Sequence, residues 1–282
     1  MSRTRTTVAA AVSALALLGA AGCGGDDGGT AAGGGGSTGG GVELVSDGVI
    51  TTCTHLPYEP FQFQEGDEVV GFDVDVVDEI ASDLGVEQEI VNIPFETIQS
   101  GEALNAGQCD VAAAGMTITD VREENMDFST PYFDATQALL VPADSGISSA
   151  EDLDGLQLAV QSGTTGADYA AENIPGAELV TYEDLGLLLT AVQTGQVDAG
   201  INDNGVLLDF VADNPELAVT TEFDTGEQYG IGVRTGNTAL LDQVDTTLER
   251  IREDGTYDEI YTEWFGSAPS ASSSPSPSAS AS

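Results

Sequence analysis

Residues 113–125 read A-A-G-M-T-I-T-D-V-R-E-E-N, a short apolar run that ends in a threonine-bearing turn. Arg122 follows Thr117, the first threonine of that turn, by five residues. A guanidinium offers a planar fork of donors that fits a carboxylate, and Thr117 with the turn backbone would complete a small polar site. The alternative is a surface ion pair with one of three acidic neighbours, which are Glu123, Glu124 and Asp127.

Acidic side chains dominate the charge of the chain. Its 282 residues include 48 Asp and Glu against 6 Arg and no Lys, for a formal net charge of -42. Such a surface repels nucleic acid, which we exclude as a partner, and we expect a protein kept soluble and compact in a salty medium. The 41% apolar residues fall in clear strand and helix patterns, which argues against disorder in the central region.

The amino-terminal segment, residues 1–22, reads as a secretion signal with Arg3 and Arg5 before a short apolar run. The run is too short to span a bilayer comfortably, which needs roughly 20 apolar residues. The sequence A-A-G-C at 20–23 resembles a bacterial lipobox, which would make Cys23 the lipidated first residue of the mature protein. Plain secretion with cleavage nearby is the alternative. In both cases we expect the protein outside the cytoplasm. If Cys23 is lipidated, we expect it to anchor the protein to the outer face of the membrane.

The two remaining cysteines are Cys53 and Cys109. An exported protein with two cysteines favours a disulfide. However, Cys53 lies near the end of one expected strand and Cys109 at the start of another. In parallel strands in register they would be several residues apart, beyond the roughly 7 Å between Cα atoms that a bridge allows. The sequence leaves the bond open.

Composition divides the rest of the chain. Residues 23–41 are a Gly-rich stretch expected to be a flexible tether, and residues 267–282 are Ser, Ala and Pro, expected to be disordered. The region between them is long enough for two lobes. It begins in β-α-β-α-β order, which implies a parallel sheet with ligands at the carboxyl ends of its strands. The expected strands are 49–54, 89–93 and 110–116, and the expected helices 71–85 and 96–106.

A second run of the same kind starts near residue 138. Apolar runs predict strands, and the helices between them show 3.6-residue periodicity. The expected strands are 139–142, 156–161, 197–201 and 229–234. The expected helices are one from 162–165 through Tyr169, one at 183–193, one capped by 202–204, one with Leu241, Val244, Leu248 and Ile251 on its face, and one that ends near Trp264.

Several residues at strand ends are candidates for a binding site. Ser162-Gly163-Thr164-Thr165 forms a helix amino terminus whose free N–H groups suit an anion, although every capped helix has such groups. Asp203 suits an ammonium group, or is only a helix cap. Tyr58 and Phe95 would flank a ligand, or belong to the core. His55 is the only histidine and has no metal-ligand spacing around it, so we expect no metal site and no cofactor.

With these groups assembled, the chain resembles the bacterial family 3 extracellular solute-binding proteins, the polar amino-acid binders that serve ABC importers. The resemblance covers residues 48–266. It rests on seven short landmarks in order: 56–61 (L-P-Y-E-P-F), 71–75 (G-F-D-V-D), 115–122 (G-M-T-I-T-D-V-R), 127–132 (D-F-S-T-P-Y), 161–165 (Q-S-G-T-T), 197–203 (V-D-A-G-I-N-D) and 254–257 (D-G-T-Y). It implies an α/β, type II periplasmic-binding-protein fold of two lobes joined by two crossings, with lobe 1 at 42–135 and 230–266 and lobe 2 at 136–229.

The resemblance also implies roles for individual residues. Arg122 would hold the ligand α-carboxylate, helped by the backbone of Thr117 and Thr165. Asp203 would take the α-ammonium, with contributions from Gly115 and Thr117. Tyr58 and Phe95 would flank the side chain of the ligand. Three further residues are candidates for ligand binding, which are Thr164, Gln161 and His55.

The ligand is less defined. His55 stands where several relatives carry an aspartate that contacts a cationic or amide side chain, so a preference for basic amino acids does not carry over. An acidic ligand would require a protonated His55, or Arg234 in the cleft. We expect a polar neutral amino acid such as glutamine, bound by a monomeric, non-enzymatic receptor for an ABC permease. The alternatives are an exported enzyme that resembles cyclohexadienyl dehydratases and a ligand-sensing subunit for a membrane receptor.

Overall fold

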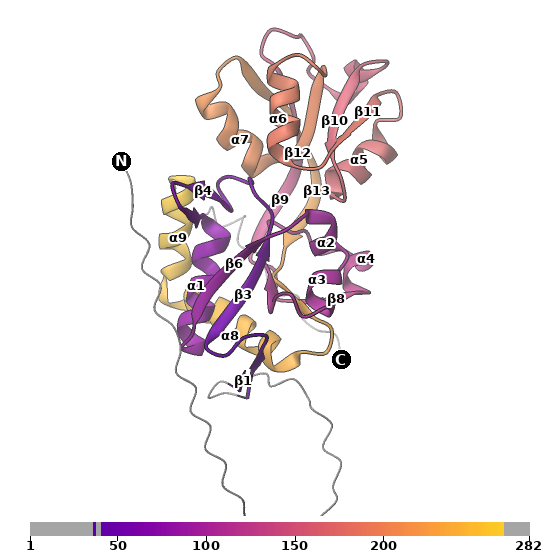
Figure 1. Ribbon diagram of the computed structural model, residues 1–282. Coiled ribbons are helices and arrows are strands. Elements are labelled where there is room, and N and C mark those ends of the chain that lie inside the picture. Colours follow the sequence, from indigo (N-terminus) through magenta and orange to yellow (C-terminus); the bar gives the residue numbers. More distant parts are fainter. Residues whose placement is uncertain (1–35, 38–40, 268–282) are drawn as a thin grey trace, which may run out of the picture. The chain divides into compact units, whose positions relative to one another are not determined.

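A computed structural model describes residues 36–37 and 41–267, and two five-stranded sheets organise them (Figure 1). The first sheet has the order β6-β3-β7-β14-β8 and the second β11-β10-β12-β9-β13. The strands of the first sheet are β3 (Val49–Thr54), β6 (Glu87–Asn92), β7 (Val111–Ala112), β8 (Met126–Phe128) and β14 (Gly232–Arg234). Those of the second are β9 (Phe133–Pro142), β10 (Gln157–Gln161), β11 (Glu178–Tyr182), β12 (Ala199–Asp203) and β13 (Leu217–Tyr229).

Helices cover both faces of the first sheet. Ile50 of β3 and Val111 of β7 pack into one core with the apolar faces of three helices, α1 (Phe72–Leu84), α8 (Thr238–Asp254) and α9 (Thr256–Phe265). Cys53 and Ala112, on the opposite face, pack against α2 (Phe95–Gln99) and α3 (Glu102–Asn105). Successive strand residues point to opposite faces, so one short buried strand serves both layers.

The second sheet is layered in the same way. Leu140 and Ala159 face the core that holds α6 (Leu185–Gln193) and α7 (Asn204–Asp213). Leu139 and Leu158 face the side covered by α5 (Thr165–Asn173). The parallel core predicted from the sequence is therefore present in both sheets, β3 with β6 and β7, and β10 with β11 and β12.

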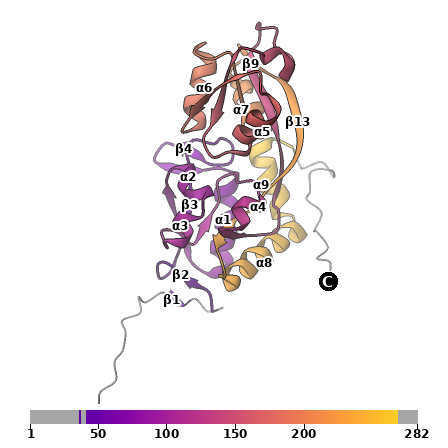
Figure 2. The same cartoon turned by 90° about the vertical axis from the view of Figure 1, so that its right-hand side faces the viewer.

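Two long strands, β9 and β13, run from one sheet-bearing half to the other (Figure 2). They pair antiparallel, with Tyr229 opposite Phe133 at one end and Leu217 opposite Pro142 at the other. The register shifts between Phe223 and Glu227, so extra residues of β13 bulge out there. The lobe boundary expected between residues 135 and 136 lies within β9, and the one expected between 229 and 230 lies at the end of β13. The bounds given for the lobes stay a prediction.

The remaining short elements complete the described chain. β1 (Gly36–Ser37) lies within the expected tether and pairs with β2 (Glu43–Leu44). A hairpin of β4 (Phe63–Glu65) and β5 (Glu68–Val70) precedes α1, and α4 (Asp120–Glu123) carries Arg122. The expected strand 110–116 shrinks to the two residues of β7, and the expected strand 229–234 divides between the end of β13 and β14.

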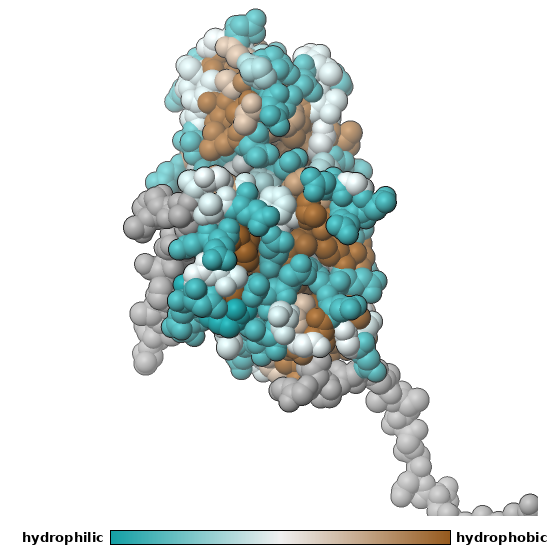
Figure 3. Space-filling view, turned by 90° about the vertical axis from the view of Figure 1, so that its left-hand side faces the viewer, coloured by the Kyte–Doolittle hydropathy of each residue, from teal (hydrophilic) through white to brown (hydrophobic). Residues whose placement is uncertain are grey.

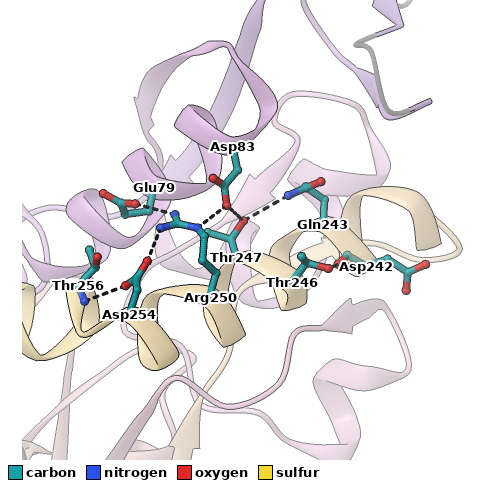
Figure 4. Close-up of polar contacts among 9 residues, drawn as sticks. All are labelled: Glu79, Asp83, Asp242, Gln243, Thr246, Thr247, Arg250, Asp254 and Thr256. Atoms are coloured by element: carbon teal, nitrogen blue, oxygen red, sulfur yellow. Dashed lines mark hydrogen bonds and ion pairs between the residues drawn. The ribbon is translucent and has the colours of Figure 1, made fainter.

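Helix α8 is tied to α1 through Arg250. Its guanidinium contacts Glu79 at 2.6 Å and Asp83 at 2.9 Å, both on α1, and Asp254 at 3.1 Å on its own helix (Figure 4). Thr247, one helical turn earlier, donates to the same Asp83 carboxylate at 2.8 Å. Two carboxylates of α1 thereby hold α8 against α1.

Cys53 and Cys109 form a disulfide, with their Cα atoms 5.6 Å apart. The argument against this bond assumed that the second strand begins near Cys109 and runs in register with the first. Instead β7 begins at Val111, opposite Thr52, and Cys109 lies in the loop before it. The loop carries Cys109 beside Cys53 on the face covered by α2 and α3.

Hydrophilic residues cover most of the face seen in Figure 3, with smaller hydrophobic areas between them. Within residues 36–37 and 41–267, no helix has the length and apolar character needed to cross a membrane. The signal segment 1–22, Cys23, most of the tether and residues 268–282 of the expected disordered tail lie outside the described residues.

Candidate functional site

A cavity of about 20 Å³ lies between the two sheet-bearing halves. Twelve residues line it: His55, Tyr58, Gln62, Phe95, Ala114, Gly115, Thr117, Arg122, Gln161, Thr164, Thr165 and Asp203. The structure therefore brings together all ten candidates named from the sequence and adds Gln62 and Ala114. The space is close to that of a single water molecule, so the facing side chains nearly meet.

Arg122 is buried at the wall of the cavity, with 5% of its surface exposed. The side chain of Thr119 caps α4 by accepting from the backbone N–H of Arg122 at 3.2 Å. This bond begins the helix that carries the Arg122 side chain. The guanidinium donates to the carbonyl of Thr117 at 2.6 Å and to that of Gly163 at 3.0 Å, and it lies 5.4 Å from the centre of the Phe95 ring.

No carboxylate pairs with Arg122 in the part of the chain that the structure describes, since the ion pairs found there all belong to Arg250. The alternative of a surface pair with its acidic neighbours is therefore wrong. Burial lowers the pKa of the Arg122 guanidinium, and the carboxylates of Asp203 and Glu227 oppose that effect. A guanidinium still remains charged at neutral pH, so the cavity holds a buried cation whose hydrogen bonds go to neutral carbonyls.

Asp203 ends β12 and precedes α7, where the sequence also allowed a capping role. Its side chain makes no capping bond. It accepts instead from the hydroxyls of Tyr58, at 2.6 Å, and Tyr229, and from the amide of Gln137. Burial, and then the charge of Glu227, raise the pKa of Asp203 to about 6 despite these bonds.

Glu227 is a carboxylate of this site that the sequence did not identify. It accepts from the hydroxyls of Thr117 and Thr165, each at 2.8 Å, and from Gln137 at 3.1 Å. Thr117 follows the first sheet's β7 and Thr165 opens α5 on the second sheet, so one carboxylate bonds to both halves. Its position on a crossing strand was the available signal, because such a strand must pass beside the cleft.

Gly115 and Tyr58 fit together closely. Gly115 has φ of 55°, and a Cβ there would lie 2.7 Å from a ring carbon of Tyr58, so a glycine is required. Its N–H donates to the buried carboxylate of Asp73 at 2.8 Å, which also accepts from Tyr132 at 2.7 Å. Burial raises the pKa of Asp73 to about 6. Asp73 thus holds the turn that lets Tyr58 approach Asp203.

The second wall comes from the segment after β10. Thr164 caps α5 by accepting from the Ala167 N–H at 3.1 Å. Gln161, 2% exposed, accepts from the amide of Asn202 at 3.2 Å, and Asn202 also accepts from Tyr58 at 2.9 Å. This network joins the end of β10 to the end of β12 and reaches the first wall through Tyr58.

His55 and Gln62 complete the first wall. The Nδ1 of His55 contacts the carbonyl of Ile93 at 2.9 Å, and the Gln62 amide nitrogen donates to the carbonyl of His55 at 3.3 Å. Their other polar atoms, Nε2 of His55 and Oε1 of Gln62, are buried without a hydrogen-bond partner. Arg234, exposed at the end of β14, does not line the cavity.

The arrangement suits binding of a small ion with both charges. A cation, Arg122, and an anion, Asp203, face one cavity with aromatic rings and threonine hydroxyls between them. Across residues 36–37 and 41–267, no group of three His, Cys, Asp or Glu side chains is placed to hold a metal ion.

Comparison with known proteins identifies the family to which the chain is similar. The model of the bacterial extracellular solute-binding proteins, family 3, matches residues 50–267. The probable histidine-binding protein of Neisseria gonorrhoeae is 33% identical over 77% of this chain and 83% of its own length. The ABC transporter glutamine-binding protein GlnH of Bacillus subtilis (strain 168) is 36% identical over 72% of this chain and 75% of its own.

Solved structures agree in fold. An ancestral arginine-binding protein bound to arginine has a TM-score of 0.73 and 39% identity, over 78% of this chain and 99% of that one. The ancestral amino acid-binding protein AncCDT-1, a precursor of cyclohexadienyl dehydratase, has a TM-score of 0.73 and 35% identity, over 77% and 96%. The expected type II periplasmic-binding-protein fold is confirmed, and the chain belongs to the family 3 bacterial extracellular solute-binding proteins.

Proposed function

We propose that this protein is an extracytoplasmic receptor that binds a polar L-amino acid between its two lobes and delivers it to an ABC permease. The observation that carries the proposal is the buried guanidinium of Arg122, which pairs with no carboxylate among the described residues and shares a cavity with the carboxylate of Asp203. An α-amino acid carries one carboxylate and one ammonium group on the same carbon atom. It is the smallest common ligand that would pair with both.

The roles of individual residues follow from that pairing. Arg122 would hold the α-carboxylate bidentately, with backbone N–H groups of Thr117 and Thr165. Asp203 would accept from the α-ammonium, in place of the hydroxyl and amide donors that it now has, with Gly115 beside it. The side chain of the ligand would lie among the other cavity residues, which are Tyr58, Phe95, Thr164, Gln161 and His55.

Closure of the lobes would transmit binding to the permease. Arg122 belongs to the first half of the molecule but donates to Gly163 of the second, and Tyr58 of the first half donates to Asp203 of the second. A ligand that touches both halves stabilises the closed arrangement by its differential affinity for it. The permease would then recognise the closed surface.

A thermal-shift screen of the purified full-length protein in high salt tests this function. The common L-amino acids would be compared with sugars and dicarboxylates, because a ligand that binds only the folded state raises the melting temperature. We expect a rise for one or a few amino acids. A folded protein that responds to none of them would contradict the proposal.

An enzyme of the cyclohexadienyl-dehydratase type is the second candidate. It is favoured by the similarity to AncCDT-1 and by Asp203, whose pKa of about 6 would suit proton transfer near neutral pH. Incubation with prephenate and arogenate would release a dehydrated, decarboxylated product if this function were present. The absence of product, together with a thermal shift for an amino acid, would leave the receptor alone.

We also propose that lipidated Cys23 anchors the receptor, as a monomer, to the outer face of the membrane. The sequence around Cys23 supports this, and the tether would hold lobe 1 (42–135 and 230–266) and lobe 2 (136–229) away from the bilayer. A Cys23→Ala variant should move from the membrane fraction to the medium. Mass spectrometry of the mature amino terminus and the elution volume in gel filtration would test the lipid and the monomer separately.

A further inference from the structure

A second hollow lies where helices of the two halves meet. We call it the α7–α9 groove, because residues of α7, of α9 and of the start of β9 line it. Its volume is about 560 Å³, against about 20 Å³ for the cavity at Arg122, and no residue lines both. Figures 1 and 2 both show α7 next to one end of α9. Sites for small molecules commonly measure roughly 300 to 1,000 Å³, so the groove has room for one.

Aromatic side chains make up much of the groove wall. Phe133 of β9 lines the groove with Tyr261, Trp264 and Phe265 of α9, and these last three are only half-buried. The ring centres of Tyr261 and Phe265 lie 4.7 Å apart, and those of Phe133 and Phe265 lie 5.2 Å apart. The indole N–H of Trp264 donates to Asp75 at 2.6 Å, which holds that ring in place. Ring faces attract cations, most strongly those that are easily stripped of water.

Carboxylates supply negative charge at the same place. Asp209 of α7 lines the groove, and no described residue donates a hydrogen bond to its carboxylate or forms an ion pair with it. Burial, and then the charge of Asp213, raise the pKa of Asp209. Burial, and then the charges of Asp209 and Asp213, also raise the pKa of Glu59 in the first half. Three carboxylates from both halves are therefore close enough to repel one another.

The groove contains little to offset this charge. None of the described residues that line it is Lys, Arg or His. Arg252 lies near Asp134 at the start of β9, but its guanidinium donates to the carbonyl of Pro131 at 2.6 Å and lies over the ring of Tyr257. Asp134 itself accepts from the amide of Gln228 at 2.9 Å. Asp209 is thus the carboxylate of the groove that lacks a donor.

These features define the chemistry of a ligand. An anion would be repelled, and a neutral apolar molecule would leave the carboxylate of Asp209 as it is. A primary ammonium group is compact and strongly hydrated, so transfer to aromatic rings costs it more hydration than it costs an alkylated one. An alkylated ammonium ion places a positive charge near Asp209 and apolar groups against the rings.

We propose that the α7–α9 groove is a second binding site, which takes a small alkylated ammonium ion between Asp209 and the aromatic side chains of α9. The inference goes beyond the proposed amino-acid receptor and does not depend on it, since the two sites share no lining residue.

Titration of the full-length protein with three probes tests the site. Choline carries a trimethylammonium group, 3,3-dimethylbutan-1-ol is its neutral isostere, and ethanolamine carries the same charge without methyl groups. Trp264 is the only tryptophan of the chain, so its emission reports on the groove, and calorimetry gives the affinity. At a constant ionic strength of about 0.15 M, we expect saturable binding of choline, about tenfold tighter than of either other probe.

Three variants locate the site. Asp209→Asn should weaken choline about tenfold, whereas Asp209→Glu keeps the charge and should stay within about threefold of the original. Asp242→Asn is the matched control, because it removes one charge from an exposed position of α8 that does not line the groove. It should leave choline affinity unchanged. The melting temperature of each variant checks that it folds.

Equal affinities for choline and ethanolamine would overturn the proposal, since they would show only the general attraction of an acidic surface for cations. Equal affinities for choline and its neutral isostere would do so as well, because the charge would then have no role. Asp203→Asn separates the two sites and should leave choline binding intact. If Asp203→Asn abolished that binding while Asp209→Asn did not, choline would lie in the cavity at Arg122 and the groove would not be its site.

Discussion

Two arginines of this chain differ in their exposure and in the groups that their guanidinium contacts. Arg250 has a side chain that is 35% exposed, and three carboxylates, Glu79, Asp83 and Asp254, surround it (Figure 4). Arg122 is 5% exposed, and its donors reach two backbone carbonyls. Although the chain has 48 acidic residues, the more buried guanidinium of these two has no carboxylate partner among the residues that the structure describes.

The difference separates a structural contact from a binding contact. A carboxylate arriving at Arg250 would displace one already present, so nothing would be gained. At Arg122 the carbonyl dipoles compensate the positive charge only in part, and the carboxylate of a ligand would neutralise the rest. Burial that costs the empty site free energy therefore becomes affinity when the ligand binds.

Exchange of each arginine for alanine should give the largest difference between the two positions. Arg122→Ala would leave a ligand carboxylate desolvated without its donors, a loss of about 3 to 5 kcal/mol, or roughly 150-fold or more in affinity. Arg250→Ala should leave amino-acid affinity unchanged. Titration of both variants, with the melting temperature as a check of folding, decides the matter; an Arg122→Ala affinity within a few-fold of the original would end the assignment.

The pH dependence of binding sharpens the comparison next. The ligand ammonium needs ionised Asp203, whose pKa is raised to about 6, so affinity should fall about tenfold from pH 7.5 to pH 5. The stability of the fold should change with pH in the opposite direction. Because the pKa of Asp203 is higher in the folded protein than in the unfolded chain, its contribution to the free energy of unfolding is present below about pH 4 and is lost as pH rises through 6.

Asp203→Asn provides the control for the pH experiment. It should bind weakly at all pH values and show no fall below pH 6, because the titrating group has been removed. A fall of the same size in this variant would assign the pH dependence to another group. The Arg250 cluster, by contrast, should play no part in it.

Glu227→Gln should have a smaller effect on affinity. The change keeps the shape of the side chain but removes the charge that bridges Thr117 and Thr165, so the amino-acid ligand should bind about fivefold more weakly. Glu222→Gln, at an exposed position of the same strand, is the matched control. If both changes had equal effects, the bridge across the two halves would have no role of its own.

The smallest effect is expected at Arg250 itself. Exposed ion pairs contribute little, so Arg250→Ala should lower the free energy of unfolding by about 1 kcal/mol at low salt. Ions screen exposed charges, and the loss should shrink in 1 M salt, where the Debye length is about 3 Å. Denaturant titration at two salt concentrations measures it; a loss independent of salt would indicate packing of α8 rather than charge.

Much of the fold was predictable because buried strands and amphipathic helices carry strong patterns. The strand at Val49–Thr54 came out as expected, and the helix expected at 96–106 is present as the two short helices α2 and α3. Strand β13 was missed, since it lies at the edge of its sheet and mixes threonines, acids and Gly226. An edge strand needs no continuous apolar run, so the periodicity that reveals a central strand is weak there.

The site followed the same rule. Residues at the carboxyl ends of strands were predictable, because the topology alone brings those ends together. Gln62, Gln137 and Glu227 were missed, since a loop and the two crossing strands, rather than the carboxyl ends of strands, supply them. The disulfide was left open because its geometry depended on where β7 begins, and a two-residue strand has no pattern that fixes its first residue.

The place of β14 in the first sheet has a consequence for the order of assembly. β14 lies between β7 and β8, although it follows the whole second sheet along the chain. A polypeptide synthesised from its amino terminus can complete the second sheet once residue 229 is available. The first sheet keeps an open gap beside β7 until residue 234. The half that begins first is therefore the last to finish, and a nascent chain stopped between these points would hold one finished sheet and one unpaired edge.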